Sequence, residues 1–121
     1  MNMDITPLLS PIHEQSPCGE DYSFSNEFHA IKNAKTQDDM LLDQGDWVTE
    51  PKQADWDFVA TTSINLLQSK SKDIRLLTWI SEAWASLYGF EGIAKSLELS
   101  HRLLEQYWLH LHPEVEEDDL D

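Results

Sequence analysis

The sequence predicts an all-α fold, a small helical bundle of about four to five helices with an antiparallel C-terminal hairpin and an irregular acidic N-terminal half. From Asp73 to Pro113, apolar residues recur at steps of three and four, the spacing that keeps side chains on one helix face. Residue types that begin and end helices stand at the borders of these runs. With 121 residues, the chain is long enough for one compact core and too short for two.

The N-terminal arm, residues 1–17, is predicted to be extended or turning. Each proline in it fixes one backbone dihedral and disfavours helix in the residue before, and the prolines stand at Pro7, Pro11 and Pro17. Its apolar side chains are expected to attach the arm to the core: Leu8, Leu9 and Ile12. A first helix of about three turns should follow, opened by Ser23 or Ser25, because Phe24, Phe28 and Ile31 are spaced four and three apart.

Residues 37–54 predict a loop, since the apolar spacing gives way to acidic residues, Gly45 and Pro51. One short helix is expected near residues 40–42. Asp55 should then cap the second main helix, because a short carboxylate can accept hydrogen bonds from the otherwise unpaired amides of a first helical turn. The expected apolar positions of this helix are Phe58, Val59, Thr62, Leu66 and Leu67.

The first half of the hairpin is predicted to be a central helix, capped by Asp73 and apolar nearly all round. One face carries Ile74, Leu77, Ile80, Trp84, Leu87 and Tyr88, and the other carries Leu76, Trp79, Ala83 and Ala85. Gly89 is expected to end this helix, because glycine adopts a positive φ without steric cost. A short link from Gly89 to Gly92 then makes the two halves antiparallel neighbours.

The second half of the hairpin is predicted to bury one stripe and to end at Pro113. The stripe consists of Ile93, Leu97, Ser100, Leu104, Trp108 and Leu111. Trp79, Trp84 and Trp108 are accordingly expected in the core. Trp47 and Trp56 each follow an aspartate near a loop or a helix start. Two interpretations stay open for them: they fold the loop back onto the helices, or one is an exposed aromatic anchor of a protein interface.

The formal charge of -15 disfavours nucleic acid or an anionic membrane surface as a partner, because their phosphate groups require a basic face. Residues 1–50 hold ten acids against two bases, residues 51–113 hold seven against six, and the last eight residues hold six acids. No apolar run approaches a membrane span, and residues 1–9 lack the pattern of a secretory signal. The single cysteine, Cys18, excludes an internal disulfide and predicts a cytoplasmic location.

Histidines and acids are present, but their spacing is poor for catalysis or metal binding. His110 and His112 would point about 200° apart on a helix, and roughly 16 Å of helix rise would separate His101 from His112. The four glycines stand too far apart for a phosphate-binding loop. The sequence therefore predicts no enzyme, no cofactor and no metal site. The alternative is a small hydrolase that uses an acidic residue together with His112.

Several short motifs occur in an order and spacing typical of one family. They are Pro7-Leu8-Leu9, Pro17-Cys18-Gly19-Glu20-Asp21, Gly45-Asp46-Trp47, Ala54-Asp55-Trp56, Ser71-Lys72-Asp73-Ile74-Arg75-Leu76, Tyr88-Gly89-Phe90 and Tyr107-Trp108-Leu109-His110-Leu111-His112-Pro113. Over essentially its whole length, the chain resembles the N-terminal, ImpA-related domain of the TssA family of bacterial type VI secretion systems. It departs from the family pattern after Asp21, where Tyr22-Ser23-Phe24-Ser25 stands in place of Leu-x-Tyr-Asp.

The resemblance implies a scaffold or adaptor domain in the cytoplasm of a bacterium, which makes protein contacts while the baseplate, tail tube and contractile sheath assemble. It implies a helical domain over residues 1–113, with residues 114–121 an acidic tail or the start of a linker. The residues expected to contact a partner are Cys18, Glu20, Asp21, Asp46 and Trp47. Those expected to support the structure are Asp55, Trp56, Asp73, Arg75, Trp79, Trp84, Gly89, Trp108 and Pro113.

The resemblance leaves the partner open. The expected partners are the baseplate, the membrane complex, the sheath or tube, or later domains of the parent protein itself. The parent could also be a related accessory protein that acts at the sheath end or carries a membrane anchor. The isolated domain is expected to be a monomer or weak dimer, and the parent a ring-forming homo-oligomer. For Arg75, a structural role is expected, with Asp21, Asp46 or Asp55 as its acidic partner.

Overall fold

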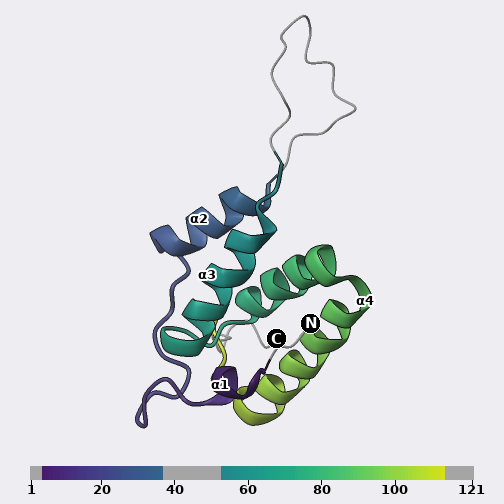
Figure 1. Cartoon of the computed structure of the whole chain (residues 1–121). Coiled ribbons are helices and arrows are strands. Elements are labelled where there is room, and N and C mark those ends of the chain that lie inside the picture. The colour runs from purple at the N-terminus through teal and green to yellow at the C-terminus, as the bar shows by residue number, and fades with distance from the viewer. Residues whose placement is uncertain (1–3, 37–52, 114–121) are drawn as a thin grey trace, which may run out of the picture.

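The computed structural model describes residues 4–36 and 53–113, and this part of the chain is all-α, as predicted. The described residues form four helices, labelled in Figure 1: α1 (Thr6–Leu9), α2 (Asn26–Lys35), α3 (Trp56–Ser69) and α4 (Ile74–Tyr107). α3 packs against α4 and α2, while α1 contacts both α3 and α4. Two isolated bridges, Gly19 with Ser71 and Asp73 with His112, are the only β-type pairing among the described residues.

The N-terminal arm differs from the prediction at one point, because Thr6–Leu9 forms a single helical turn. Pro7 stands in its first turn, where the missing amide hydrogen has no intrahelical partner to lose. Ser25 opens α2 as expected, since its side chain accepts a hydrogen bond from the Phe28 amide at 3.1 Å. Phe28 is buried, whereas Phe24 precedes the cap and is fully exposed. Phe24 therefore lies outside the helix that its spacing suggested.

Asp55 caps α3 as predicted. Its side chain accepts a hydrogen bond from the Phe58 amide at 3.1 Å, and its own amide donates to the Ala34 carbonyl at 2.7 Å. The cap therefore also joins the start of α3 to the end of α2. Trp56 follows and is partly buried against the core. The fully buried apolar side chains of α3 are Val59 and Leu67.

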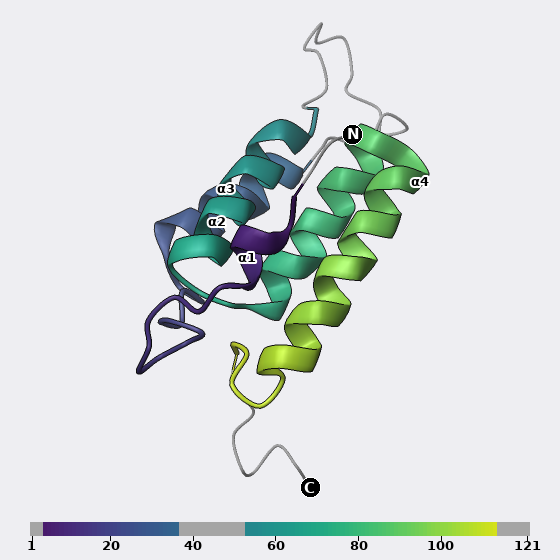
Figure 2. The ribbon, with the colours of Figure 1, turned by 60° about the horizontal axis from the view of Figure 1, so that its bottom comes forward.

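The long helix α4 consists of two helices that meet at Gly89, where φ is 62° and ψ is -137°. Figure 2 shows the two halves, residues 74–88 and 90–107, running side by side in opposite directions. The link is shorter than the predicted Gly89–Gly92, because helical geometry resumes at Phe90. Gly92 instead lies inside the second half, where an added Cβ would come within 2.1 Å of the Trp84 carbonyl oxygen. Glycine at this position lets the two backbones touch.

The core is centred on the first half of α4, as predicted for a helix that is apolar nearly all round. Trp84 and Ile80 are fully buried, and Trp79 is nearly so. The Trp79 ring meets the Phe28 ring edge to face, with 5.0 Å between the ring centroids and 81° between the planes. This aromatic contact joins α4 to α2.

The second half of α4 buries a different face from the one predicted. Its buried positions are Gly92, Ser96, Leu99, Leu103 and Tyr107. Leu97 and Trp108, which were expected in the core, are 64% and 67% exposed. The physical reason is the close approach at Gly92 and Ser96: small side chains bring this helix onto its neighbour, so the face richest in apolar residues turns outward.

The C-terminal segment also differs from the prediction, because α4 ends at Tyr107 and not at Pro113. After a turn, Leu111 and His112 run beside the segment that precedes α4. The His112 amide donates to the Lys72 carbonyl at 2.9 Å, and the Ile74 amide donates to the His112 carbonyl at 2.9 Å. The amide and the carbonyl of His112 thus have backbone partners outside a helix. The chain leaves α4 before this pairing, and so Pro113 lies beyond the helix.

Several predictions fall outside the described residues. They are the loop over residues 37–52 with its short helix near residues 40–42, the roles of Asp46 and Trp47, and the acidic tail at residues 114–121.

Candidate functional site

Three of the sequence motifs meet at one place, which we call the motif junction: residues 17–23, 70–75 and 111–113. The Lys72 amide donates to the Cys18 carbonyl at 2.7 Å, and the Glu20 amide donates to the Lys70 carbonyl at 3.2 Å. Gly19 has a φ of +69°, and a Cβ there would come within 2.2 Å of the Lys70 carbonyl oxygen. Glycine is therefore required at position 19, both because φ is positive there and because the Lys70 backbone leaves no room for a side chain.

Lys72 is fully buried in the motif junction. Its Nζ donates hydrogen bonds to the carbonyl oxygens of Leu8, at 2.6 Å, and Leu67, at 2.8 Å, so it joins α1 to the end of α3. Burial disfavours the charged ammonium and lowers the pKa of Lys72 from 10.5 to about 8, although the nearby Cys18 thiolate form would act in the opposite sense. The neutral amine keeps two N–H donors, which matches the two carbonyls.

Asp73 is also fully buried, and it acts twice. It caps α4 by accepting a hydrogen bond from the Arg75 amide at 2.7 Å, as predicted, and it pairs with the Arg75 guanidinium, whose NH2 group lies 2.6 Å from its Oδ2. The hydrogen bond from the guanidinium to Asp73 raises the pKa of Arg75. The expected structural role of these two residues agrees with this geometry.

Arg75 extends the network to the acidic N-terminal loop. Its NH2 group donates to the Ser23 hydroxyl at 2.8 Å and lies 3.4 Å from Asp21, one of the partners expected for it. Its guanidinium carbon lies 5.1 Å from the centre of the Phe28 ring. A hydrogen bond from the Ser23 hydroxyl is the main cause that lowers the pKa of Asp21, and Arg75 adds to it. Arg75 therefore joins α4, α2 and the loop between α1 and α2.

A shallow groove of about 300 Å³ opens beside the motif junction. It is lined by Gln15, Ser16, Pro17, Cys18, Gly19, His110 and His112. His112 is mostly buried, and its Nε2 donates to the Gly19 carbonyl at 2.9 Å. No group of three metal-ligating side chains occurs among residues 4–36 and 53–113. The buried ionisable groups of the junction are thus already bonded within the fold, which makes the junction a structural centre.

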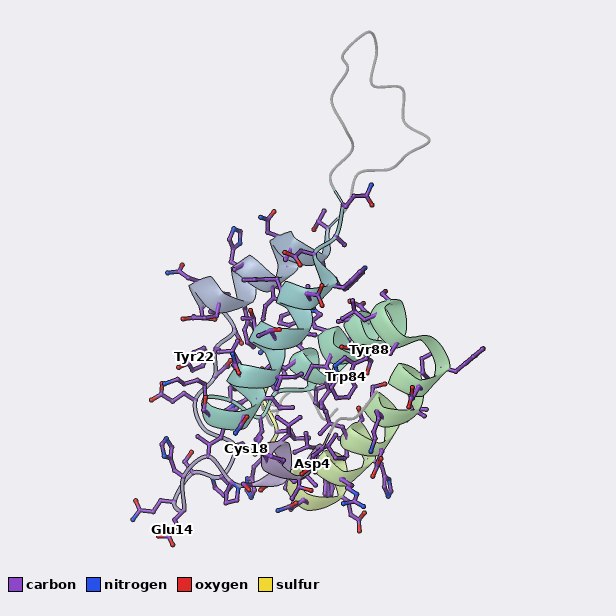
Figure 3. The ribbon with its side chains drawn as sticks, viewed as in Figure 1. Asp4, Glu14, Cys18, Tyr22, Trp84 and Tyr88 are labelled. Atoms are coloured by element: carbon purple, nitrogen blue, oxygen red, sulfur yellow. The ribbon has the colours of Figure 1, made fainter. Side chains whose placement is uncertain are left out.

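The residues predicted to contact a partner are divided by the structure. Cys18 is only 4% exposed, so its side chain offers little surface to a partner, and its contact with a partner stays a prediction. In Figure 3, Cys18 lies inward beside α1, whereas Glu14 stands at the outer tip of the same loop. Glu20 and Asp21 are exposed, and their contact with a partner stays a prediction.

Exposed apolar side chains gather on α4 instead. Ten large hydrophobic residues are exposed in the described part of the chain, and eight of them lie on α4 or directly after it. The row on the first half is Ile74, Thr78, Ser81, Ala85 and Tyr88, and the row on the second half is Ile93, Leu97, Ser100, Leu104 and Trp108. α4 packs against α1 and α3, and by helix periodicity each row lies away from most of the buried positions of its own half. We call these two rows the outer hairpin face.

Sequence reasoning assigned the second row to the core, and it placed Ile74 and Tyr88 of the first row on the core face as well, although both are exposed. The apolar spacing 93, 97, 104, 108 is the stronger stripe, whereas the buried positions include Gly92 and Ser96. The available signal was the glycine at 92, three residues after Gly89, which favours close helix packing at that position. The outer hairpin face is uncharged along both rows, and it is the candidate functional site.

Comparison with known proteins agrees with the fold and the motifs. Residues 9–121 match the family described as "ImpA, N-terminal, type VI secretion system". The chain belongs to this family. The ImpA N-terminal family is that of a domain of a bacterial secretion-system component, and it is not known as an enzyme family.

Two relatives place this ImpA N-terminal domain more closely. It is 30% identical over 118 residues to the type VI secretion system component TssA1 of Pseudomonas aeruginosa. This match covers 97% of this chain and 33% of the relative. It is 37% identical, with a TM-score of 0.81, to a solved N-terminal domain, including the conserved ImpA_N region, of the TssA component from Burkholderia cenocepacia. That match covers 99% of this chain and 43% of the solved one.

The chain therefore has the sequence and fold of a TssA N-terminal domain, and it spans about a third of the curated relative. The helices described in residues 4–36 and 53–113 include none that is both long and apolar enough to cross a membrane.

Proposed function

We propose that this domain is a non-enzymatic adaptor of a TssA-like protein, which holds other type VI secretion components while the baseplate, tail tube and contractile sheath assemble. The observation that carries the proposal is the outer hairpin face. Soluble domains rarely expose many large apolar side chains on one helix pair unless another protein covers them. Trp108 and Leu97 are the prominent exposed residues of this face, and tryptophan is frequent among the residues that dominate binding energy.

The motif junction supports a binding role over a catalytic one. Catalysis requires an acid or base that is available to a substrate. Lys72 instead donates to two backbone carbonyls, and Asp73 is held by Arg75. We infer that the domain acts in the bacterial cytoplasm, which agrees with its single, buried cysteine.

Pairwise binding measurements test this function. Each component of the apparatus from the same bacterium is purified separately and titrated against the full chain on a biosensor surface. Saturable binding of at least one component is expected, with a Kd that does not change when ATP, divalent metal or chelator is added. If no component binds, or if the chain turns over a substrate, the adaptor function is wrong.

A further inference from the structure

Cys18 and Lys72 form a buried pair of nucleophilic side chains in the motif junction. We propose that this pair is a redox-sensitive cross-link: hydrogen peroxide oxidises the Cys18 sulfur, which then forms a covalent bond to Nζ of Lys72. The placement of the two side chains, the groove beside Cys18 and the hydrogen bonds of Lys72 support this bond. The bond does not depend on the adaptor function.

The two side chains lie on the same face of a short antiparallel pairing. Gly19 and Ser71 form an antiparallel bridge, so Cys18 and Lys72, the next residues along each segment, stand opposite each other. The Lys72 amide donates to the Cys18 carbonyl at 2.7 Å, which fixes this register. Side chains in opposite positions leave the same face, with Cβ atoms about 4.5–5.5 Å apart. Cys18 is 4% exposed and Lys72 is fully buried, so both side chains point into the protein.

Cys18 also lies within electrostatic range of the two side chains that hold the N-terminal arm. Burial is the main cause that lowers the pKa of Lys72 and raises that of Tyr107, and a negative charge on Cys18 shifts both upward. Lys72 donates to the Leu8 carbonyl at 2.6 Å, and the Tyr107 hydroxyl donates to the neighbouring Leu9 carbonyl at 2.6 Å. The thiol and the amine therefore meet beneath the arm.

A small oxidant has access to Cys18. The groove of about 300 Å³ beside the motif junction is lined in part by Cys18, together with His110 and His112. A water molecule occupies about 30 Å³ in the liquid, and hydrogen peroxide is only slightly larger. The low exposure of Cys18 leaves almost no surface for a bulky thiol reagent. The position of this thiol thus favours small oxidants.

The first step oxidises the sulfur. The thiolate is the nucleophilic form of cysteine, and an adjacent ammonium stabilises it. The Cys18 sulfur attacks one peroxide oxygen, the O–O bond breaks, and the departing hydroxide takes a proton from the Lys72 ammonium. The products are a sulfenic acid, one water molecule and a neutral amine. A pKa of about 8 makes the Lys72 ammonium a suitable donor of this proton.

The second step joins the two side chains. The neutral amine of Lys72 has two N–H groups, which the Leu8 and Leu67 carbonyls accept at 2.6 and 2.8 Å, so its lone pair remains for the sulfur. The nitrogen attacks the sulfur, the S–O bond breaks, and the leaving hydroxide takes one proton from nitrogen to form a second water. Sulfenic acids condense with a backbone nitrogen in the same way. Overall, the sulfur loses two electrons and the peroxide gains them.

The S–N bond attaches the loop between α1 and α2 covalently to the start of α4. The bonded nitrogen keeps a single N–H group, so either the Leu8 or the Leu67 carbonyl loses its donor. Oxidation therefore replaces one hydrogen bond, at the arm or at α3, with a covalent link. A thiol reductant cleaves the link and restores the original contacts.

Peptide mapping of the full chain after treatment with hydrogen peroxide tests the cross-link. Mass spectrometry should find the peptide of Cys18 joined to that of Lys72, with a mass lower by two hydrogen atoms than the sum of the two. Dithiothreitol should separate them. No link to Lys70 is expected, because its side chain is exposed. If Cys18 carries only added oxygen, or if peroxide leaves it unchanged, the proposal is wrong.

Two variants identify the nitrogen. Lys72→Gln keeps N–H donors for the two carbonyls but has no nucleophilic nitrogen, so oxidation of Cys18 should continue to the sulfinic acid. Lys70→Gln is the matched control and should form the link as the original chain does. A joined peptide in Lys72→Gln would contradict the role of Lys72. Circular dichroism reports whether each variant folds, and if Lys72→Gln does not, the map of the original chain still decides.

Discussion

At the start of α4, the buried side chains of Lys72 and Asp73 lie next to each other in the sequence but are held by different partners. Lys72 bonds two carbonyls, from α1 and α3, while Asp73 bonds Arg75. A buried charge is tolerated only when its hydrogen bonds are made within the fold. These residues therefore join the N-terminal arm, α3 and α4. Substituting them should lower the free energy of unfolding, and any effect on partner binding should be secondary.

Arg75→Ala is expected to lower the free energy of unfolding by about 3 kcal/mol, because it leaves the carboxylate of Asp73 buried without its cation. Urea unfolding of the two proteins measures the difference. The matched control is Arg102→Ala, whose exposed pair with Glu98 should contribute less than about 1 kcal/mol. An Arg75→Ala variant with unchanged stability but no partner binding would contradict the structural role.

Lys72 predicts a dependence of stability on pH. Its pKa is about 8 in the folded chain and 10.5 in its ordinary state, so the folded chain gives up this proton first. Between about pH 8 and about pH 10.5, the unfolded chain binds more protons at Lys72 than the folded chain does. The free energy of unfolding should therefore increase with pH across this window, and Lys72 should add no such increase below it. The rise should be up to about 3 kcal/mol.

Urea unfolding at about pH 7.5 and about pH 9.5 gives the free energy of unfolding of the original chain and of Lys72→Met. At each pH the value for Lys72→Met is subtracted from that of the original chain, and the two differences are compared. Burial raises the pKa of Tyr107, which reduces stability at the alkaline end in both proteins and cancels in this difference. A difference that does not change with pH would show that the Lys72 ammonium is not destabilised by burial.

At the scale of elements, the hairpin depends on two glycines for different reasons. Gly89 has φ 62° and ψ -137°, a backbone conformation that essentially only glycine adopts, and no neighbouring atom would touch an added Cβ. Gly92 has ordinary helical geometry, but the Trp84 backbone occupies the space of a side chain. One glycine shapes the turn, and the other sets the distance between the helices.

Substitution to alanine should separate these two roles. Gly89→Ala is expected to cost about 1–3 kcal/mol through backbone strain. Gly92→Ala should cost at least as much, and because it pushes the two halves apart it should also change the near-ultraviolet circular dichroism of the buried Trp84. Equal near-ultraviolet spectra for both variants would contradict the close approach at Gly92.

The capped starts of the helices were predictable from the sequence, because Ser25, Asp55 and Asp73 act through bonds to residues two or three positions away. The buried face of the second half of α4 was not, since it depends on a tertiary contact at Gly92 that outweighs the apolar spacing. The end of α4 was missed for a similar reason, because His112 pairs with a segment forty residues earlier in the chain. Local signals fix helix starts, while long-range contacts decide which face is buried.

At the scale of the whole molecule, the chain carries a net charge of -15, whereas both rows of the outer hairpin face consist of uncharged residues. Repulsion between copies should keep the chain monomeric even though that face is apolar. Multi-angle light scattering of the full chain at low salt is expected to give the monomer mass. A stable dimer that Leu97→Lys dissociates would show that a second copy covers the face.

The central claim is that another component of the secretion apparatus covers the outer hairpin face. Cys18 is the only cysteine and is buried, so Leu97→Cys creates one reactive thiol on the face and Phe24→Cys creates one before α2, outside the two rows. The rate of maleimide labelling is measured for each variant with and without the bound component. The account predicts that labelling of Leu97→Cys slows at least about tenfold in the complex while that of Phe24→Cys does not change. Unchanged labelling at position 97 in a complex that is fully formed would contradict it.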